Sequence, residues 1–274
     1  MSPLADRLSA SSALYRDPLA QVDWDALDTA VSWMPEERIS LYGLPEWEGL
    51  SEAERVRLGQ SEMVAFQELG MWLEALFMER IAAQVRKGTG ELMDLNYQLH
   101  ELREESGHSL MFVELLRRSG LEPLTVGHRR PRTATAFARW APFDSAGFWI
   151  AILLGEAVPD QMNRLLHRDE RIPLPVRQVI RVHMREEARH IAYARQRSTE
   201  RLAAMPGAAR GTLARIMRPV FRQFVGECFY PSPAIYARAG LPNPRHLARA
   251  ARANPHRRDL VERCVGPAVD ARMV

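Results

Sequence analysis

Two segments of the sequence each carry a glutamate and a histidine three residues apart. The pairs are Glu105 with His108, and Glu187 with His190. Because an α-helix turns by about 100° per residue, side chains three positions apart lie about 60° apart on one face. A carboxylate and an imidazole at this spacing can converge on one metal ion. Two such pairs on facing helices would hold two ions side by side.

A di-metal site in a helical bundle also needs one carboxylate from each of two further helices. Glu156 lies in the apolar run 148–158, where an acid is costly unless it is paired or bound to a metal. Asp160 is the nearest alternative in that segment. An earlier segment offers three acids: Glu68, Glu74 and Glu79. Of these, Glu74 lies beside the apolar stripe of its segment, so we predict that Glu74 supplies the ligand, with Glu79 and Glu68 left open.

A third histidine extends the second pair. His183 lies one turn before Glu187, so it can face the same cavity. The pattern differs from the zinc-protease signature, which requires His-Glu-x-x-His. Histidines and glutamates in these proportions suit iron or manganese, in competition with zinc. The predicted metal ligands are Glu74, Glu105, His108, Glu156, His183, Glu187 and His190.

Simpler interpretations exist for each of these residues taken alone. A single Glu-x-x-His pair is usually a solvated helix face, and His183 alone could be a core histidine bonded to a backbone carbonyl. Two pairs combined with acids inside apolar stripes favour the metal site. The remaining histidines have no matching partners and are predicted to be structural or exposed: His100, His128, His167, His246 and His256.

The elements that must position these residues are helices. Ser51 and Glu54 have the spacing of a capping box, and apolar residues recur at helical spacing after them. We expect long helices over residues 51–86, 91–118, 144–167, 176–204 and 208–229, and a short one over 24–33. Two helical hairpins with a longer connection between them predict an all-α, ferritin-like four-helix bundle with additional N- and C-terminal helices.

Length and composition fit one globular domain. The chain has 274 residues, of which 46% are hydrophobic and 26% charged, which excludes disordered, collagenous and coiled-coil classes. We predict a single ferritin-like di-metal domain over 1–274, with a bundle core at about 51–205 and a helical extension at about 206–274.

Charge and targeting signals are uninformative about partners. The net charge is only +3, and the basic residues interleave with acids, so nucleic-acid binding is not predicted. The longest apolar run is too short to cross a membrane, and the N-terminus lacks a secretion signal. The two cysteines cannot build a disulfide framework, so the expected location is the cytoplasm.

The ligand set resembles that of the di-iron arylamine N-oxygenases, typified by p-aminobenzoate N-oxygenase, within the ferritin-like superfamily. Ordinary ferritin-like enzymes have two histidine ligands, and the additional histidine one turn before the last glutamate, here His183, distinguishes this group. The resemblance covers about residues 51–197.

The resemblance implies a function. Two iron ions, or manganese in their place, would activate O2 and oxidise an aromatic amine to a hydroxylamine, nitroso or nitro product. An external donor would supply electrons, since no flavin or nicotinamide fingerprint is present, and a homodimer is expected. The alternatives are carbon hydroxylation or desaturation at the same site, or a ferritin-like protein for metal storage or oxidative-stress protection. The long tail after Pro231 argues against a storage cage.

Overall fold

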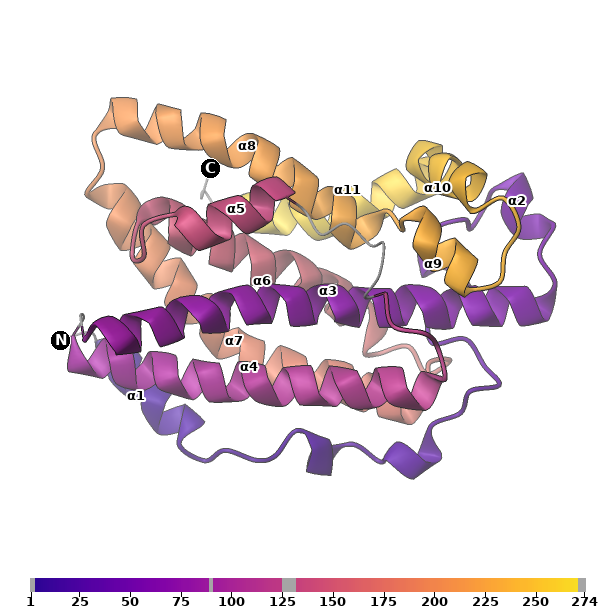
Figure 1. Ribbon diagram of the computed structural model, residues 1–274, viewed down its shortest axis with the longest axis horizontal. Helices are drawn as coiled ribbons and strands as arrows, with labels where there is room; N and C mark the ends of the chain where they lie inside the picture. Colours follow the sequence, from indigo (N-terminus) through magenta and orange to yellow (C-terminus); the bar gives the residue numbers. More distant parts are fainter. Residues whose placement is uncertain (1–2, 89–90, 125–131, 271–274) are drawn as a thin grey trace.

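The structure is a computed structural model that describes residues 3–88, 91–124 and 132–270. Within these ranges the chain consists of helices and loops, with no strand (Figure 1). Four long helices form the bundle: α3 (Glu52–Lys87), α4 (Leu92–Ser119), α6 (Ala146–Leu166) and α7 (Leu174–Ala203). Helices α3 and α4 form one hairpin, and α6 and α7, which pack most extensively, form the other. The predicted four-helix bundle is confirmed.

Local sequence signals set the ends of the first hairpin. The Ser51 hydroxyl accepts a hydrogen bond from the Glu54 backbone N–H, while the Glu54 carboxylate accepts one from the Ser51 N–H, so the predicted capping box is present. Gly88 and Gly120 follow α3 and α4 with φ of 63° and 62°. This left-handed conformation ends a helix at little cost only when the residue has no Cβ.

The additional helices pack around the four-helix bundle. These are α1 (Pro3–Ser12), α2 (Pro45–Glu48), α5 (Arg132–Trp140), α8 (Gly207–Phe229), α9 (Pro233–Arg238), α10 (Pro244–Ala253) and α11 (Pro255–Asp270). Helices α5 and α8 pack on each other and on α3 and α6, α11 packs on α6, and α1 packs separately on α4 and α7. Helix α5 was not predicted, because the sequence before it reads as a proline-containing linker.

The prediction of a helix over residues 24–33 is wrong. Only a short 3-10 turn, η2 (Trp24–Ala26), forms there. The carbonyl groups of Thr29 and Val31 accept hydrogen bonds from the Gln60 side chain, 2.8 and 2.9 Å away, and so are not available to a helix. The Asp28 carbonyl is likewise taken by the Trp33 indole N–H at 2.9 Å. Tertiary hydrogen bonds thus replace helical ones in this segment.

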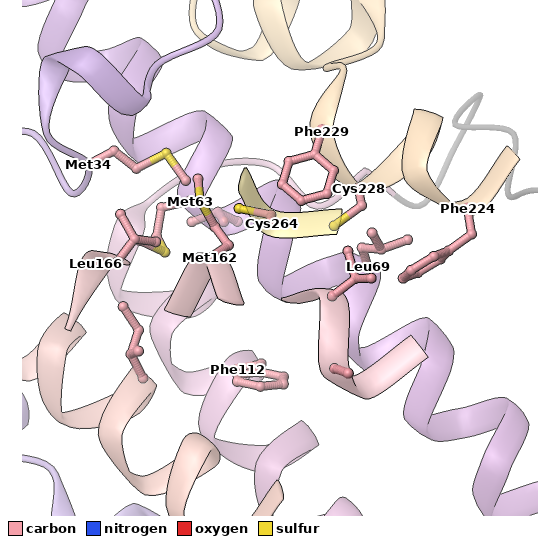
Figure 2. Close-up of a cluster of buried hydrophobic side chains, with 14 of the residues drawn as sticks. Met34, Met63, Leu69, Phe112, Met162, Leu166, Phe224, Cys228, Phe229 and Cys264 are labelled. Atoms are coloured by element: carbon pink, nitrogen blue, oxygen red, sulfur yellow. The ribbon is translucent and has the colours of Figure 1, made fainter. Parts of the chain in front are cut away.

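A buried cluster at one end of the bundle joins the C-terminal helices to the four-helix core. Figure 2 shows Met34, Met63 and Met162 from three separate segments lying near Cys264. Both cysteines are free and buried, which agrees with the absence of a disulfide framework. None of the described helices is both long and apolar enough to cross a bilayer.

Two buried arginines attach the C-terminal extension to α3. The Arg238 side chain, 3% exposed, lies 2.7 Å from the Glu68 carboxylate and also donates to the backbone carbonyl of Ser61 at 2.6 Å. Arg257 lies 3.6 Å from Glu62 and donates to the Phe229 carbonyl at 2.6 Å. These contacts are compatible with one domain, which remains a prediction.

Candidate metal centre

Carboxylates and imidazoles from three of the four bundle helices, α3, α4 and α7, converge on the bundle interior. Among the described residues they form two groups, in each of which one ligand atom per residue lies within 4.8 Å of the others. Group 1, as we call it, consists of Glu74, His108 and His183. Group 2 consists of Glu105, Glu187 and His190. Six of the seven predicted ligands are therefore brought together.

Glu187 and Glu105 belong to group 2 but also face histidines of group 1. One Glu187 oxygen, Oε1, is 3.2 Å from Nδ1 of His190, 3.3 Å from Nδ1 of His108 and 3.5 Å from Nε2 of His183. The two Glu105 oxygens lie 3.2 Å from Nδ1 of His190 and 3.5 Å from Nδ1 of His108. Each carboxylate thus faces ligand nitrogens of both groups, the position from which a carboxylate can bridge two ions.

Glu156, the seventh predicted ligand, lies against group 2 without belonging to it. Burial, together with the charges of Glu187 and Glu105, raises its pKa well above the ordinary value. Glu101, one helical turn before Glu105, is also buried, and burial raises its pKa well above the ordinary value. Sequence reasoning missed Glu101, although its i–4 spacing from Glu105 was a visible signal. Two buried carboxyl groups with raised pKa values therefore flank group 2.

The structure distinguishes among the three acids considered on the first bundle helix. Glu74 is 2% exposed and reaches the centre, where the Ser109 hydroxyl donates to its Oε2 at 2.6 Å. Glu68 instead pairs with Arg238, and Glu79 is half-exposed beside Arg139. Asp160, the alternative to Glu156, pairs with Arg164 at 2.6 Å.

The donor set fits divalent cations. Five buried atoms of the two groups have no hydrogen-bond partner among the described residues: Oε1 of Glu74, both oxygens of Glu105, Nδ1 of His108 and Oε2 of Glu187. Each unsatisfied buried polar atom costs about 1–3 kcal/mol. Two metal ions would satisfy all five, and mixed imidazole and carboxylate ligands suit iron, manganese or zinc.

Two further glutamates orient the histidines of the Glu-x-x-His pairs. Nε2 of His108 lies 3.0 Å from Glu186, and Nε2 of His190 lies 3.0 Å from Glu104. A carboxylate on the outer nitrogen directs the lone pair of Nδ1 towards the centre. Sequence reasoning missed both residues. The available signal was the doubling of the acid in Glu104-Glu105 and Glu186-Glu187.

The N-terminal segment closes the outer side of these contacts. Arg189 lies 2.8 Å from Glu104 and donates to the Ser12 hydroxyl at 2.9 Å. The absence of a side chain at Gly107 permits this packing, because a Cβ there would lie 2.8 Å from the Tyr15 hydroxyl. The outer carboxylates are thus held by both the bundle and the segment that covers it.

His128 falls outside the described residues. The other four histidines that were not predicted as ligands lie away from the centre. His246 pairs with Glu46 at 2.9 Å, and Nε2 of His256 faces the Glu37 carbonyl at 2.8 Å. His100 lies 3.1 Å from Arg103, and His167 lies 3.2 Å from the Arg164 carbonyl.

The electrostatic balance of the centre depends on the histidines. Burial alone would lower the pKa of His108, but hydrogen bonds to Glu105 and Glu186 and the charge of Glu187 raise it to about 10. Burial opposes a charge on His190 as well, yet Glu187 and Glu105 raise its pKa well above the ordinary value. In the metal-free protein, protonated imidazoles therefore neutralise part of the carboxylate charge.

This balance predicts a pH dependence. A histidine whose pKa is higher in the folded than in the unfolded state contributes stability that is complete below the unfolded pKa, about 6.5. The contribution of His108 is lost as the pH rises through its folded pKa of about 10. We expect the Tm of the metal-free protein to fall between pH 7 and pH 10. The loaded protein is the control, because its imidazoles are already neutral, and equal profiles for the two forms would contradict the prediction.

Comparison with known proteins shows where similar sequences occur. The p-aminobenzoate N-oxygenase AurF family matches residues 2–271. "Uncharacterized protein MT0908" of Mycobacterium tuberculosis is 22% identical over 232 residues, 82% of this chain and 68% of the relative. "Uncharacterized protein Mb0909" of Mycobacterium bovis matches with the same identity and coverage.

Solved structures with a similar fold include R2-like ligand-binding oxidase with an aerobically reconstituted Mn/Fe cofactor. Its TM-score is 0.63 at 15% identity, and the matched region covers 99% of this chain and 91% of the oxidase chain. A mutant form of that oxidase, also with a Mn/Fe cofactor, has a TM-score of 0.60 at 14% identity. The matched region covers 99% of this chain and 92% of the mutant chain. At these identities the likeness shows the shared fold.

Proposed function

The chain belongs to the p-aminobenzoate N-oxygenase AurF family, and from this premise we propose that it uses two metal ions and O2 to oxidise the nitrogen of an aromatic amine. The observation that carries the proposal is the pair of carboxylate–histidine groups, in which Glu105 and Glu187 of group 2 also face His108 of group 1. Iron is the proposed metal, and manganese is the alternative.

The proposed coordination divides the seven residues. Glu74, His108 and His183 hold one ion, and His190 holds the other together with Glu156. Glu105 and Glu187 serve both ions. Glu156, which contacts Glu187, would complete the ligand set of the second ion. The bound metals supply the activation of O2 and the redox chemistry.

The protein contributes fixed ligands and a dry interior. His108 and His190 are fully buried, and Glu187 is 1% exposed. The outer carboxylates Glu104 and Glu186 keep the imidazoles in one orientation during changes of oxidation state. Electrons come from an external donor in this proposal. The proposed assembly is a homodimer, because the family resemblance implies one.

The proposed substrate pocket is an apolar cavity on the side of α3 and α6 that α5 and α8 cover. It has a volume of about 60 Å³ and lies between α3, α5, α6 and α8, with an apolar lining that includes Trp72, Leu73, Phe137, Gly155 and Phe221. Leu73 and Gly155 directly precede the proposed ligands Glu74 and Glu156 in sequence. This lining supports an amine with an apolar aryl group. It equally favours a second candidate function, oxidation of a carbon atom in an apolar small molecule.

Rapid mixing of reduced protein with O2 tests the proposal. We expect iron-loaded protein to give an absorbance transient that decays faster with p-aminobenzoate or a neutral arylamine, with an N-oxygenated product in the mass spectrum. Acceleration only by apolar molecules without an amine would support the carbon-oxidising alternative. A decay that no substrate changes, with uptake of many irons per chain, would overturn both in favour of storage.

A further inference from the structure

His183 enters the centre in the opposite orientation to the other two histidines. His108 and His190 direct Nδ1 towards Glu187, at 3.3 and 3.2 Å. His183 instead directs Nε2 inwards, 3.5 Å from Glu187 and 3.6 Å from Glu74. Its Nδ1 points outwards, where the amide of Asn163 on α6 lies 3.4 Å away. The partner of the outer nitrogen is thus an amide here and a carboxylate in the other two cases.

The chemistry of a neutral imidazole fixes what this partner must do. A ring nitrogen that binds a metal carries no proton, so the other nitrogen carries it and needs an acceptor. Asn163 is 3% exposed, and its Oδ1 has no hydrogen-bond partner among the described residues. A half-turn of the amide about its Cβ–Cγ bond brings Oδ1 to Nδ1–H of His183 and satisfies both groups.

We propose that Asn163 is a positioning residue that selects the Nδ1–H form of His183 and makes group 1 the weaker of the two metal sites. The inference rests on the proposed di-metal centre. A carboxylate partner raises the basicity of a metal-bound imidazole, whereas a neutral amide orients the ring without adding charge. The ion held by group 1 therefore binds second and is lost first.

The exposure of the histidines leads to the same order. The His183 side chain is 13% exposed, whereas those of His108 and His190 are fully buried. Group 1 therefore has the ligand that solvent reaches most easily.

Asp160 is the competing acceptor near His183. It lies one turn before Asn163 on α6, and its Oδ1 also has no hydrogen-bond partner among the described residues. Its other oxygen, however, already accepts a hydrogen bond from Arg164 at 2.6 Å. Asp160→Asn therefore serves as the matched control for substitutions at Asn163.

Two measurements test the proposal independently of any oxygenase activity. In protein labelled with 15N-histidine and loaded with Zn2+, long-range 1H–15N spectra should show Nδ1–H for His183 and Nε2–H for His108 and His190. Titration of metal-free protein with Co2+ should give two steps. Asn163→Leu should weaken the second step by about 10–100-fold and spare the first. Asn163→Asp, which supplies a carboxylate acceptor, should leave the affinity of the second step equal to that of the unchanged protein or increase it.

Each outcome bears on the proposal. An Nε2–H form of His183 in the loaded protein, or a second step unchanged in Asn163→Leu, would overturn it, as would a larger effect of Asp160→Asn. If Asn163→Leu does not fold, the spectrum of the unchanged protein and the Asn163→Asp titration still decide. Absence of any Co2+ or Zn2+ binding would overturn the metal centre itself. Two-step binding without amine oxidation would contradict only the proposed substrate.

Discussion

Replacing Glu187 with glutamine is expected to reduce the metal content from about two ions per chain to fewer than about one. Glu187 Oε1 lies 3.2–3.5 Å from all three imidazoles of the centre. The neighbouring charges of His190, His183 and His108 overcome the effect of burial and lower the pKa of Glu187, so this residue is anionic at neutral pH. Glutamine removes the negative charge that serves both ions and places an amide N–H among ligand nitrogens.

The adjacent residue supplies the control for this prediction. Glu186→Gln changes the same functional group one position away and replaces the carboxylate partner of His108 Nε2 with a neutral amide. We expect it to weaken metal binding by about 10–100-fold while allowing full occupancy at high metal concentration. Elemental analysis after anaerobic reconstitution with Fe2+ measures both variants. Two ions per chain in Glu187→Gln would show that Glu187 is not a ligand.

Helical periodicity explains why most of the centre could be predicted from sequence. The spacing of Glu105 from His108 and of Glu187 from His190 fixes which side chains share a face, whatever the neighbouring helices do. The choice of Glu74 depended on its position beside an apolar stripe, and the structure brings Glu74 to the centre. Coordination by these residues remains a prediction until metal is measured.

Contacts between helices explain what sequence reasoning missed. Glu104, Glu186 and Asn163 each act on a histidine of another helix, so their role depends on helix rotation rather than on spacing along one helix. Glu156 lies against Glu187 but belongs to neither group, and its role as a ligand stays a prediction. Helix α5 was missed for a related reason. A helix of nine residues is stabilised by packing more than by its own propensity, and α5 packs on α8, far along the chain.

The same dependence on tertiary contacts leads to a prediction for the C-terminal extension. Arg238→Met is expected to lower the free energy of unfolding by about 3–5 kcal/mol, because removal of one partner leaves the other charge buried and unpaired. Arg238 and Glu68 have side chains only 3% and 5% exposed, 2.7 Å apart. Glu68 would keep its hydrogen bond from the backbone N–H of Leu124 but lose its counter-charge.

Chemical denaturation of the metal-free protein measures the effect of Arg238→Met, and an exposed pair provides the comparison. Arg117 lies 2.6 Å from Glu114 but is 65% exposed, so Arg117→Met should change the free energy of unfolding by less than about 1 kcal/mol. Arg238→Met combined with Glu68→Leu should be less destabilising than Arg238→Met alone, since no charge is left buried. Equal effects of Arg238→Met and Arg117→Met would show that the buried pair does not hold the extension on α3.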